Sequence, residues 1–343
     1  MSEPILKKML TSRVSKKQLT LELSFIASTT EHQNQTSGSE FILQGLSSLP
    51  HLQVLYFLFF LAIYATTICG NTILLLLMIT DVQLHTPMYF FLSNLSFIDI
   101  CFSSTVAPKI LENTLGRNRR ISFLGCAAQM YFSLALGAAE CITLAIMALD
   151  RYMAICNPLR YTTIMSRRFC LQLAGSAWTI GFLNSVIHAY LTFMLPFCRS
   201  NHVNHYLCEM PALFRLSCKD TTVNEIMVYI SGGIIALFSF LLTLVSYVHI
   251  VSAILKIRSA KGRSKVFSTC GSHLTVVSMY YGTIIFMYLR PRSSYSPERD
   301  KVLSVLYTVV TPMLNPIIYS MRNKEVKGAL RRALLKKRLP LRT

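Results

Sequence analysis

Three adjacent polar residues, Asp150, Arg151 and Tyr152, stand near the end of a long apolar stretch, in the segment MALDRYMAIC (147–156). Neighbouring acidic and basic side chains at the end of a membrane-spanning stretch can anchor a helix at the interface, relay ions or act as a switch. A partly buried ion pair weakens when a neighbouring helix moves and when water or a partner competes for it. These residues alone leave the three interpretations open.

Further polar residues lie inside the apolar stretches, Glu140 in the same stretch as Asp150 and the others elsewhere. Asp99 and Glu140 are carboxylic acids, and Asn71 and Asn315 are amides. Ionisable groups within a membrane are costly and usually functional. Two carboxylates near two amides could hold a sodium ion, share a proton, or lock helices together by hydrogen bonds, which is a common use of buried polar groups in membranes. Proton transport would need a longer relay or repeated halves, and the sequence has neither.

The segment HVNHYLCE (202–209) places His202, His205 and Cys208 at three-residue intervals. These residue types could ligate zinc or copper. Four cysteines are expected on the outer side of the membrane, where two disulfides allow three pairings. They are Cys126, Cys198, Cys208 and Cys218. A disulfide would consume the thiolate that a metal requires, so we favour disulfides over a metal site.

The composition of the whole chain indicates a membrane protein. Of its 343 residues, 52% are hydrophobic and 14% are charged, whereas a soluble domain carries about 25% charged residues. Seven apolar stretches approach or exceed the roughly 20 residues with which a helix crosses a bilayer. We expect spans at 52–79, 87–108, 122–150, 169–192, 224–255, 265–289 and 301–321. The predicted fold is an all-α membrane protein with a seven-transmembrane helix bundle over 52–321.

The distribution of basic residues predicts the orientation of this bundle. The segments 151–168, 256–265 and 322–342 hold four, five and nine Lys or Arg, whereas the loops of the opposite side hold eleven together. Basic segments favour the cytosol, so the C-terminus is predicted to be inside and the segment 1–51 outside. The net charge of +19 is then mostly a consequence of topology. Nucleic-acid binding would need a basic face on a folded domain, so we predict no such partner.

Both ends of the chain carry recognisable features. Residues 1–33 are polar and basic without a convincing cleavable signal, and we expect a disordered leader. Asn34, in the sequence NQT, is a predicted glycosylation site on the outer side. The tail 322–343 contains a basic amphipathic segment, 322–338, which we expect to form an eighth helix on the cytosolic membrane surface, attracted to anionic lipid.

Six segments carry a family resemblance. They are GN (70–71), LHTPMYFFLSNLSFIDICFSS (84–104), MALDRYMAICNPLRY (147–161), SY (246–247), KVFSTCGSHL (265–274) and PMLNPIIYSMRNKEVKGAL (312–330). In order and spacing they resemble the motif set of vertebrate olfactory receptors, which are rhodopsin-like (class A) G-protein-coupled receptors. Leu149, Arg160 and Gly271 depart from the usual pattern. The resemblance runs from residue 34 to the end of the chain.

The resemblance implies an odorant receptor that is not an enzyme. It would bind a small, mostly apolar volatile ligand within the bundle and activate a stimulatory olfactory-type heterotrimeric G protein, raising cAMP. Its other implied partners are the lipid bilayer of the plasma membrane and trafficking chaperones. Asp150 would pair with Arg151 at rest, and activation would free Arg151 to face the G protein. The implied switch residues are Asp150, Arg151, Tyr152, Tyr247, Asn315, Pro316 and Tyr319.

The resemblance also assigns the cysteines and the central polar residues. Its implied disulfides are Cys126–Cys208 and Cys198–Cys218. Asn71, Asp99, Glu140 and Asn315 match the central polar cluster of the family, for which a sodium ion is implied. No other metal and no organic cofactor is implied.

The ligand would lie among the outer halves of the third, fifth, sixth and seventh spans. The matching positions are Leu134, Gly137, Ala138, Cys141, Ser231, Gly232, Ile235, Tyr281, Ile284, Ile285, Tyr288, Tyr307 and Thr308, with Val228, Ser304 and Thr311 on the same faces. These faces are apolar with scattered hydroxyls, which suits a small neutral ligand. We expect about half of the positions to serve only helix packing.

Two other classes of function find less support. An enzyme would need a nucleophile–base pair, a phosphate loop or an HExxH motif, and none is present in the sequence. A channel or transporter would need a polar stripe or a selectivity ring, and the apolar stretches contain neither.

Overall fold

The computed structural model describes residues 40–45, 50–115, 119–288 and 297–338. The leader 1–33 and the predicted glycosylation residue Asn34 lie outside these ranges. So do the side chains of some residues within the described helices, among them Tyr288.

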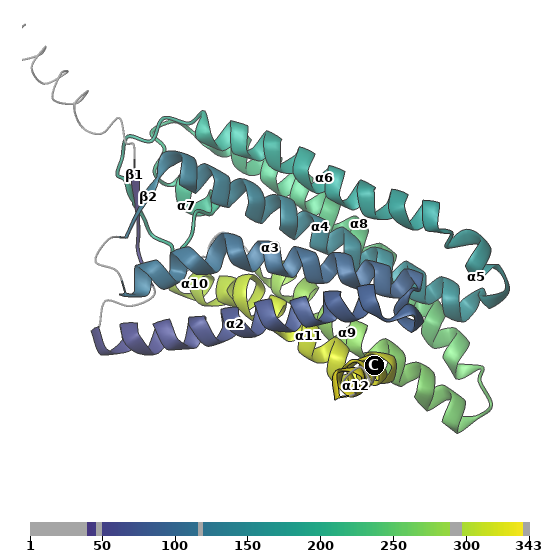
Figure 1. Ribbon diagram of the computed structural model, residues 1–343. Helices are drawn as coiled ribbons and strands as arrows, with labels where there is room; N and C mark the ends of the chain where they lie inside the picture. The colour runs from purple at the N-terminus through teal and green to yellow at the C-terminus, as the bar shows by residue number, and fades with distance from the viewer. Residues whose placement is uncertain (1–39, 46–49, 116–118, 289–296, 339–343) are drawn as a thin grey trace, which may run out of the picture.

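Long helices that run side by side make up most of the chain (Figure 1). They are α2 (Pro50–Thr80), α3 (Pro87–Leu115), α4 (Phe123–Cys156), α6 (Arg167–Phe193), α8 (Thr222–Leu255), α9 (Ala260–Tyr288) and the contiguous α10 (Pro297–Val305), η3 (Leu306–Val310) and α11 (Thr311–Arg322). Within the described residues, six helical segments are long and apolar enough to cross a membrane. The 29-residue α9 completes the bundle. The predicted seven-helix fold is confirmed.

Apolar side chains cover the outside of the bundle as well as its interior. On α8, Leu237 is 59% exposed and Phe238 69% exposed. Such a surface would be an aggregation hazard in water, but in a bilayer the hydrocarbon tails solvate it. Because lipid offers no hydrogen bonds, the backbone must satisfy its own polar groups, and helices do so within one segment.

Two helices run past their predicted ends. The helix α3 continues beyond Pro108 to Leu115, and α4 continues to Cys156. The first charged residue after the α3 apolar stretch, Lys109, is held at the surface because its Nζ lies 2.7 Å from Glu112 Oε2 and donates to the Arg120 carbonyl at 2.6 Å. An uncharged stretch therefore marks the membrane-crossing part of a helix, not its whole length.

The last span is interrupted by a π-helical turn, Leu306–Val310, which the sequence pattern did not predict. Pro312 has no backbone N–H and cannot donate to the carbonyl four residues earlier. Next to it, the backbone N–H of Thr311 and its hydroxyl both bond to the Leu306 carbonyl, five residues back. Such wide turns are frequent at functional sites.

Three short strands, not predicted from the sequence, form a sheet over one end of the bundle, which is called the outer end below because the sequence predicts that it lies outside the cell. They are β1 (Glu40–Leu43), β2 (Arg120–Ser122) and β3 (His202–Val203), in the order β2-β1-β3. The strand β1 pairs antiparallel with β2 and parallel with β3. Beneath the sheet, Phe41 and Leu43 belong to one buried cluster with Cys126 and Cys208, so the segment before α2 is packed onto the outer loops.

Short helices complete the opposite end of the bundle, which is called the inner end below. After α4, the chain turns through α5 (Pro158–Ile164), and the predicted amphipathic helix is α12 (Lys324–Arg338). Val326 and Ala329 are buried, whereas Leu334 is exposed. The helix is fastened to the turn η1 (Val82–Leu84) by Arg332, which donates to the Asp81 carboxylate at 2.6 and 2.8 Å.

Candidate functional site

At the inner end, the carboxylate of Asp150 is held by a tyrosine rather than by its neighbour Arg151. The Tyr161 hydroxyl on α5 donates to Asp150 Oδ1 at 2.8 Å. Among the described residues, no ion pair within 4.0 Å joins Asp150 to Arg151. Successive residues of a helix do not face each other, so the expected pairing of these two side chains is absent from this structure.

The surroundings of Tyr161 keep its hydroxyl protonated, so that it can donate this hydrogen bond. Burial, followed by the charge of the Asp150 carboxylate, raises the pKa of the Tyr161 hydroxyl above its ordinary value. The hydroxyl therefore stays protonated at neutral pH. Asp150 and Arg151 are both buried, so the inner end of α4 holds a carboxylate fixed by one hydrogen bond beside a guanidinium sheltered from solvent.

A second inner contact joins three helices. The Tyr247 hydroxyl of α8 lies 2.7 Å from His273 Nδ1 of α9, and His273 Nε2 lies 3.1 Å from the Leu144 carbonyl of α4. A carbonyl only accepts, so Nε2 must carry the proton and Nδ1 accepts from Tyr247. His273 is the middle residue of this hydrogen-bonded chain, and it is not among the switch residues that the family resemblance implied.

The remaining predicted switch residues lie nearby on α4 and α11. The Tyr152 ring centroid is 5.6 Å from that of His249. The buried Tyr319 hydroxyl has no hydrogen-bond partner within the described part of the chain. Pro316 packs so closely on Gly70 that a Cβ there would lie 3.0 Å from its ring, which explains the need for glycine in α2.

The structure brings the predicted central polar cluster partly together. Asn315 Nδ2 donates to both oxygens of Asp99, at 3.0 and 3.1 Å. Asn71 Nδ2 donates to the Pro312 carbonyl at 3.1 Å, tying α2 to the last span. Within this cluster, three buried oxygens have no hydrogen-bond partner in the described residues: Asn71 Oδ1, Glu140 Oε1 and Asn315 Oδ1. Carbonyl and carboxylate oxygens are the donors that a hard cation prefers, so these residues fit the implied sodium ion.

Several predicted ligand positions on α4 and α9 lie together. The Tyr281 hydroxyl donates to the Cys141 carbonyl at 3.1 Å, and the hydroxyl of its neighbour Tyr280 donates at 2.7 Å to the Gly137 carbonyl, one turn along α4. Ile235 and Ile284 pack against a buried cluster that contains Cys141, Tyr280 and Tyr281. Two tyrosines therefore fasten α9 to the backbone of α4, and Tyr280 is a contact that the sequence did not single out.

Other predicted ligand positions are scattered. Ser231 lies 2.5 Å from His188 Nε2, so its hydroxyl faces α6. Gly232 is exposed, with nothing within 4 Å of a Cβ built on it, and Ile285 is 39% exposed. Leu134 packs with the outer cluster beneath the sheet. Ala138 is half-buried on α4.

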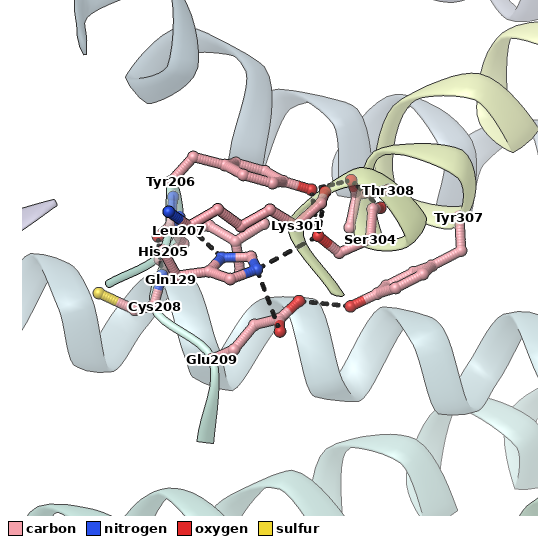
Figure 2. Close-up of polar contacts among 10 residues, drawn as sticks. All are labelled: Gln129, His205, Tyr206, Leu207, Cys208, Glu209, Lys301, Ser304, Tyr307 and Thr308. Carbon is pink, nitrogen blue, oxygen red and sulfur yellow. Dashed lines mark hydrogen bonds and ion pairs between the residues drawn. The ribbon is translucent and has the colours of Figure 1, made fainter. Parts of the chain in front are cut away.

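The predicted ligand positions of the last span are hydrogen-bonded to the loop between α6 and α8 (Figure 2). The Tyr206 hydroxyl lies 2.8 Å from Ser304 Oγ and 3.0 Å from Thr308 Oγ1. The Tyr307 hydroxyl donates to the Glu209 carboxylate. Two predicted ligand contacts, Tyr307 and Thr308, are thus bonded to loop residues. No sequence motif marked the partners of these positions, which are His205, Tyr206 and Glu209.

One disulfide joins the loop to α4, and a second lies within the loop. Cys126 is bonded to Cys208 and Cys198 to Cys218, with Cα atoms 5.5 and 5.8 Å apart, in the pairing that the resemblance implied. The Cys208 sulfur is therefore not a free thiolate for zinc or copper. In the described residues, no group of three or more His, Cys, Asp or Glu side chains is arranged to hold a metal ion.

Comparisons with known proteins agree with this geometry. A family model described as "Olfactory receptor" matches residues 60–337. The chain is 48% identical to olfactory receptor 5AR1 of Mus musculus over 307 residues, covering 90% of this chain and 99% of that protein. It is 51% identical to olfactory receptor 8U9 of Mus musculus, over 89% and 97% of the two chains. It is 49% identical to olfactory receptor 2G3 of Homo sapiens, over 88% and 97%.

Proposed function

The chain belongs to the olfactory receptor family, and from this premise we propose how its residues serve an odorant receptor. Receptors of this family are multi-pass proteins of the plasma membrane that signal through a G protein and cAMP, and they are not enzymes. We propose that odorant binding at the outer half of α4 and α9 is transmitted to the inner end, where Arg151 becomes available to the G protein.

The observation that carries this proposal is the state of Arg151. Its side chain is buried beside an Asp150 carboxylate that is bonded to Tyr161. A buried guanidinium without an ion pair within 4.0 Å in the described residues is costly to keep. A conformational change that exposes it to an acceptor on the G protein would therefore be favourable. This argument supports the switch interpretation over a passive membrane anchor, which would leave the charge in water.

The connection between the two ends runs through α9. At its outer half, Tyr280 and Tyr281 bond to α4, and at its inner half His273 bonds to both α4 and α8. A ligand that separates α9 from α4 at the tyrosines would tilt the whole helix and strain the His273 contacts. Sets of packed helices with two discrete arrangements are the usual carriers of such coupling.

The test is a cAMP assay in cells that express the receptor with an olfactory-type stimulatory G protein, across a panel of small volatile organic compounds. Arg151→Ala should abolish the odorant-dependent rise while surface staining stays at the wild-type level. Arg160→Ala removes an exposed arginine from the adjacent α5 and is the matched control; it should keep the response. A normal response in Arg151→Ala would overturn the switch proposal, and a silent but well-displayed wild type would argue against odorant reception.

For the central polar cluster we propose a bound sodium ion. The support is the set of partnerless buried oxygens on Asn71, Glu140 and Asn315 next to the Asp99 carboxylate. Bound there, sodium would stabilise the resting packing of α2, α3, α4 and α11. Replacing sodium by N-methylglucamine during purification should lower the Tm of the wild type. The Tm of Glu140→Gln should be insensitive to the exchange, and equal sensitivity would contradict a cation at this cluster.

We further propose that the outer sheet faces the extracellular side and the C-terminus faces the cytosol. Two disulfides gather at the sheet end of the bundle, and disulfides persist in oxidising compartments. The basic helix α12 lies at the opposite end, where anionic lipid is found. Accessibility of epitope tags at each terminus in intact cells tests the orientation.

We also propose trafficking chaperones and the lipid of the inner leaflet as partners of the receptor.

A further inference from the structure

An open groove of about 410 Å³, the α3–α4 groove, lies between these two helices near the outer end of the bundle. The helices run antiparallel and side by side (Figure 1). The groove is lined from Thr105 to Glu112 on α3 and from Gly125 to Phe132 on α4. Each helix contributes two turns, so the groove extends about 10 Å along their axes. Because α3 runs outward and α4 runs inward, Glu112 lies at the outer mouth, and Thr105 and Phe132 lie at the inner end.

The polar side chains deeper in the groove are bonded within the protein. The Thr105 hydroxyl donates to the Cys101 carbonyl at 2.8 Å. Gln129 Nε2 donates to the Thr105 carbonyl at 3.2 Å, and Gln129 Oε1 accepts from the backbone N–H of Cys208 at 2.9 Å. Beside them, the ring of Phe132 is 44% exposed. The inner part of the groove therefore offers an apolar surface to a ligand.

The outer mouth carries an ion pair with unused bonding capacity. Lys109 Nζ lies 2.7 Å from Glu112 Oε2 and donates to the Arg120 carbonyl at 2.6 Å. An ammonium has three N–H donors, and a carboxylate has two acceptor oxygens. One N–H of Lys109 and the Oε1 atom of Glu112 therefore have no partner in the described part of the chain. A single hydroxyl group can satisfy both, because it accepts one hydrogen bond and donates another.

The groove lies where lipid meets the protein. Lys109 directly follows the apolar stretch of α3, which places the ion pair at the level of the membrane surface and the apolar part of the groove within the hydrocarbon. The ion pair neutralises itself, and its carboxylate, with a side chain 55% exposed, repels the phosphate of a phospholipid. A sterol carries one hydroxyl on a rigid apolar body, and the plasma membrane is rich in sterol.

We propose that the α3–α4 groove binds a membrane sterol. The sterol hydroxyl accepts from Lys109 Nζ and donates to Glu112 Oε1, and the ring system lies along Ala128 and Phe132. The bound sterol bridges α3 and α4 and so stabilises the outer end of the bundle. This site is separate from the proposed odorant site, since no residue that lines the groove is a predicted odorant contact.

The first test compares two sterols that differ only in the configuration of the hydroxyl. Purified receptor in phosphatidylcholine nanodiscs would be labelled with a photoreactive diazirine analogue of cholesterol, and the labelled peptides identified by mass spectrometry. We expect label in peptides covering 105–112 and 125–132. Cholesterol should displace it, and epicholesterol should need about a fivefold higher concentration, the effect of one lost hydrogen bond. Label spread evenly over the lipid-facing helices, or equal competition by both sterols, would overturn the proposal.

The second test uses variants of the groove in the same nanodiscs. Ala128→Trp fills the groove and should abolish its labelling. Ala62→Trp is the matched control, because it places the same side chain at an exposed position of α2, and it should keep the label. Labelling of the groove that survives in Ala128→Trp would overturn the proposal.

The hydroxyl contact has its own variant. Lys109→Met removes the donor and should raise the cholesterol concentration for half displacement about fivefold. The Tm in sterol-free nanodiscs checks the fold, because this change also removes the bond to the Arg120 carbonyl. An unchanged concentration in a folded Lys109→Met would overturn the hydroxyl contact. Where this variant does not fold, the comparison of cholesterol with epicholesterol on the wild type decides the same contact.

Discussion

The two ends of the bundle are held together by different kinds of contact. The outer end has two disulfides, a three-stranded sheet and a loop whose side chains bond to the last span. At the inner end, side-chain hydrogen bonds join α4 to α5 and α8 to α9, from Tyr161 to Asp150 and from Tyr247 to His273. One hydrogen bond contributes about 1 kcal/mol, so each inner contact can be exchanged for another partner. The comparison suggests a fixed frame outside and a movable one inside.

The largest effect is expected from breaking the outer frame. Cys126→Ser removes the disulfide to Cys208 across a sequence separation of 82 residues. Loss of a native disulfide typically lowers the free energy of unfolding by roughly 2–5 kcal/mol and often prevents folding. Surface staining should fall to near background. Cys69→Ser, which removes an exposed free thiol from α2, is the control and should leave staining unchanged. Normal display of Cys126→Ser would show that the outer frame does not depend on this bond.

A smaller effect should follow from Tyr161→Phe, which breaks the inner frame. It leaves the buried Asp150 carboxylate without its donor, a cost of about 1–3 kcal/mol in the resting state. Because this destabilises only the resting arrangement, basal cAMP should rise severalfold without odorant. Tyr190→Phe changes an exposed tyrosine of α6 and should have no effect. A basal level equal to that of the wild type would mean that the Asp150–Tyr161 bond does not restrain the switch.

The connection between the two ends can be tested at α9. Tyr281→Phe removes the hydrogen bond to the Cys141 carbonyl and keeps the edge-to-face contact of the ring with Phe240. The resting packing should lose about 1 kcal/mol, which predicts an odorant EC50 shifted toward lower concentration by about fivefold. Tyr280→Phe should act in the same direction through Gly137. An EC50 that moves upward in both variants would indicate that the hydroxyls bind the ligand instead.

The smallest effect is expected at the exposed contact between α12 and the turn before α3. The hydrogen bond from Arg332 holds the pKa of the Asp81 carboxyl below its ordinary value of 3.8. A carboxyl with a depressed pKa contributes stability above its ordinary pKa, and this is lost only as the pH falls through the folded value. The Tm of wild type and Asp81→Asn should therefore differ little, and by a constant amount, from pH 6 to 8. A gap that changes across this range would point to another titrating group.

The seven spans could be predicted from the sequence because each is a long uncharged run, and lipid permits only a helix there. The disulfide pairing came from the resemblance alone, since four cysteines allow three arrangements. The outer sheet could not be predicted, because β3 has only two residues, His202 and Val203, and shows no alternation.

The loop contacts and the inner contacts were missed for a different reason. Tyr206 and Thr308 are 102 residues apart, and no local pattern connects them. The resemblance implied a pair of the adjacent Asp150 and Arg151, yet neighbouring helix positions point in different directions. The donor to Asp150 is Tyr161, which lies in a recognised motif without an assigned role. Such long-range partners become visible only once the helices are placed side by side.

Hydrogen–deuterium exchange of the purified receptor tests the contrast between the two ends most directly. The receptor would be compared alone and in complex with an activating odorant and a nucleotide-free stimulatory G protein. We predict that exchange changes in peptides covering 147–165 and 244–274, at the inner contacts. Peptides covering 120–130 and 197–218, in the outer frame, should keep their exchange rates. Changes of equal size in the outer peptides would contradict a fixed outer frame and a movable inner one.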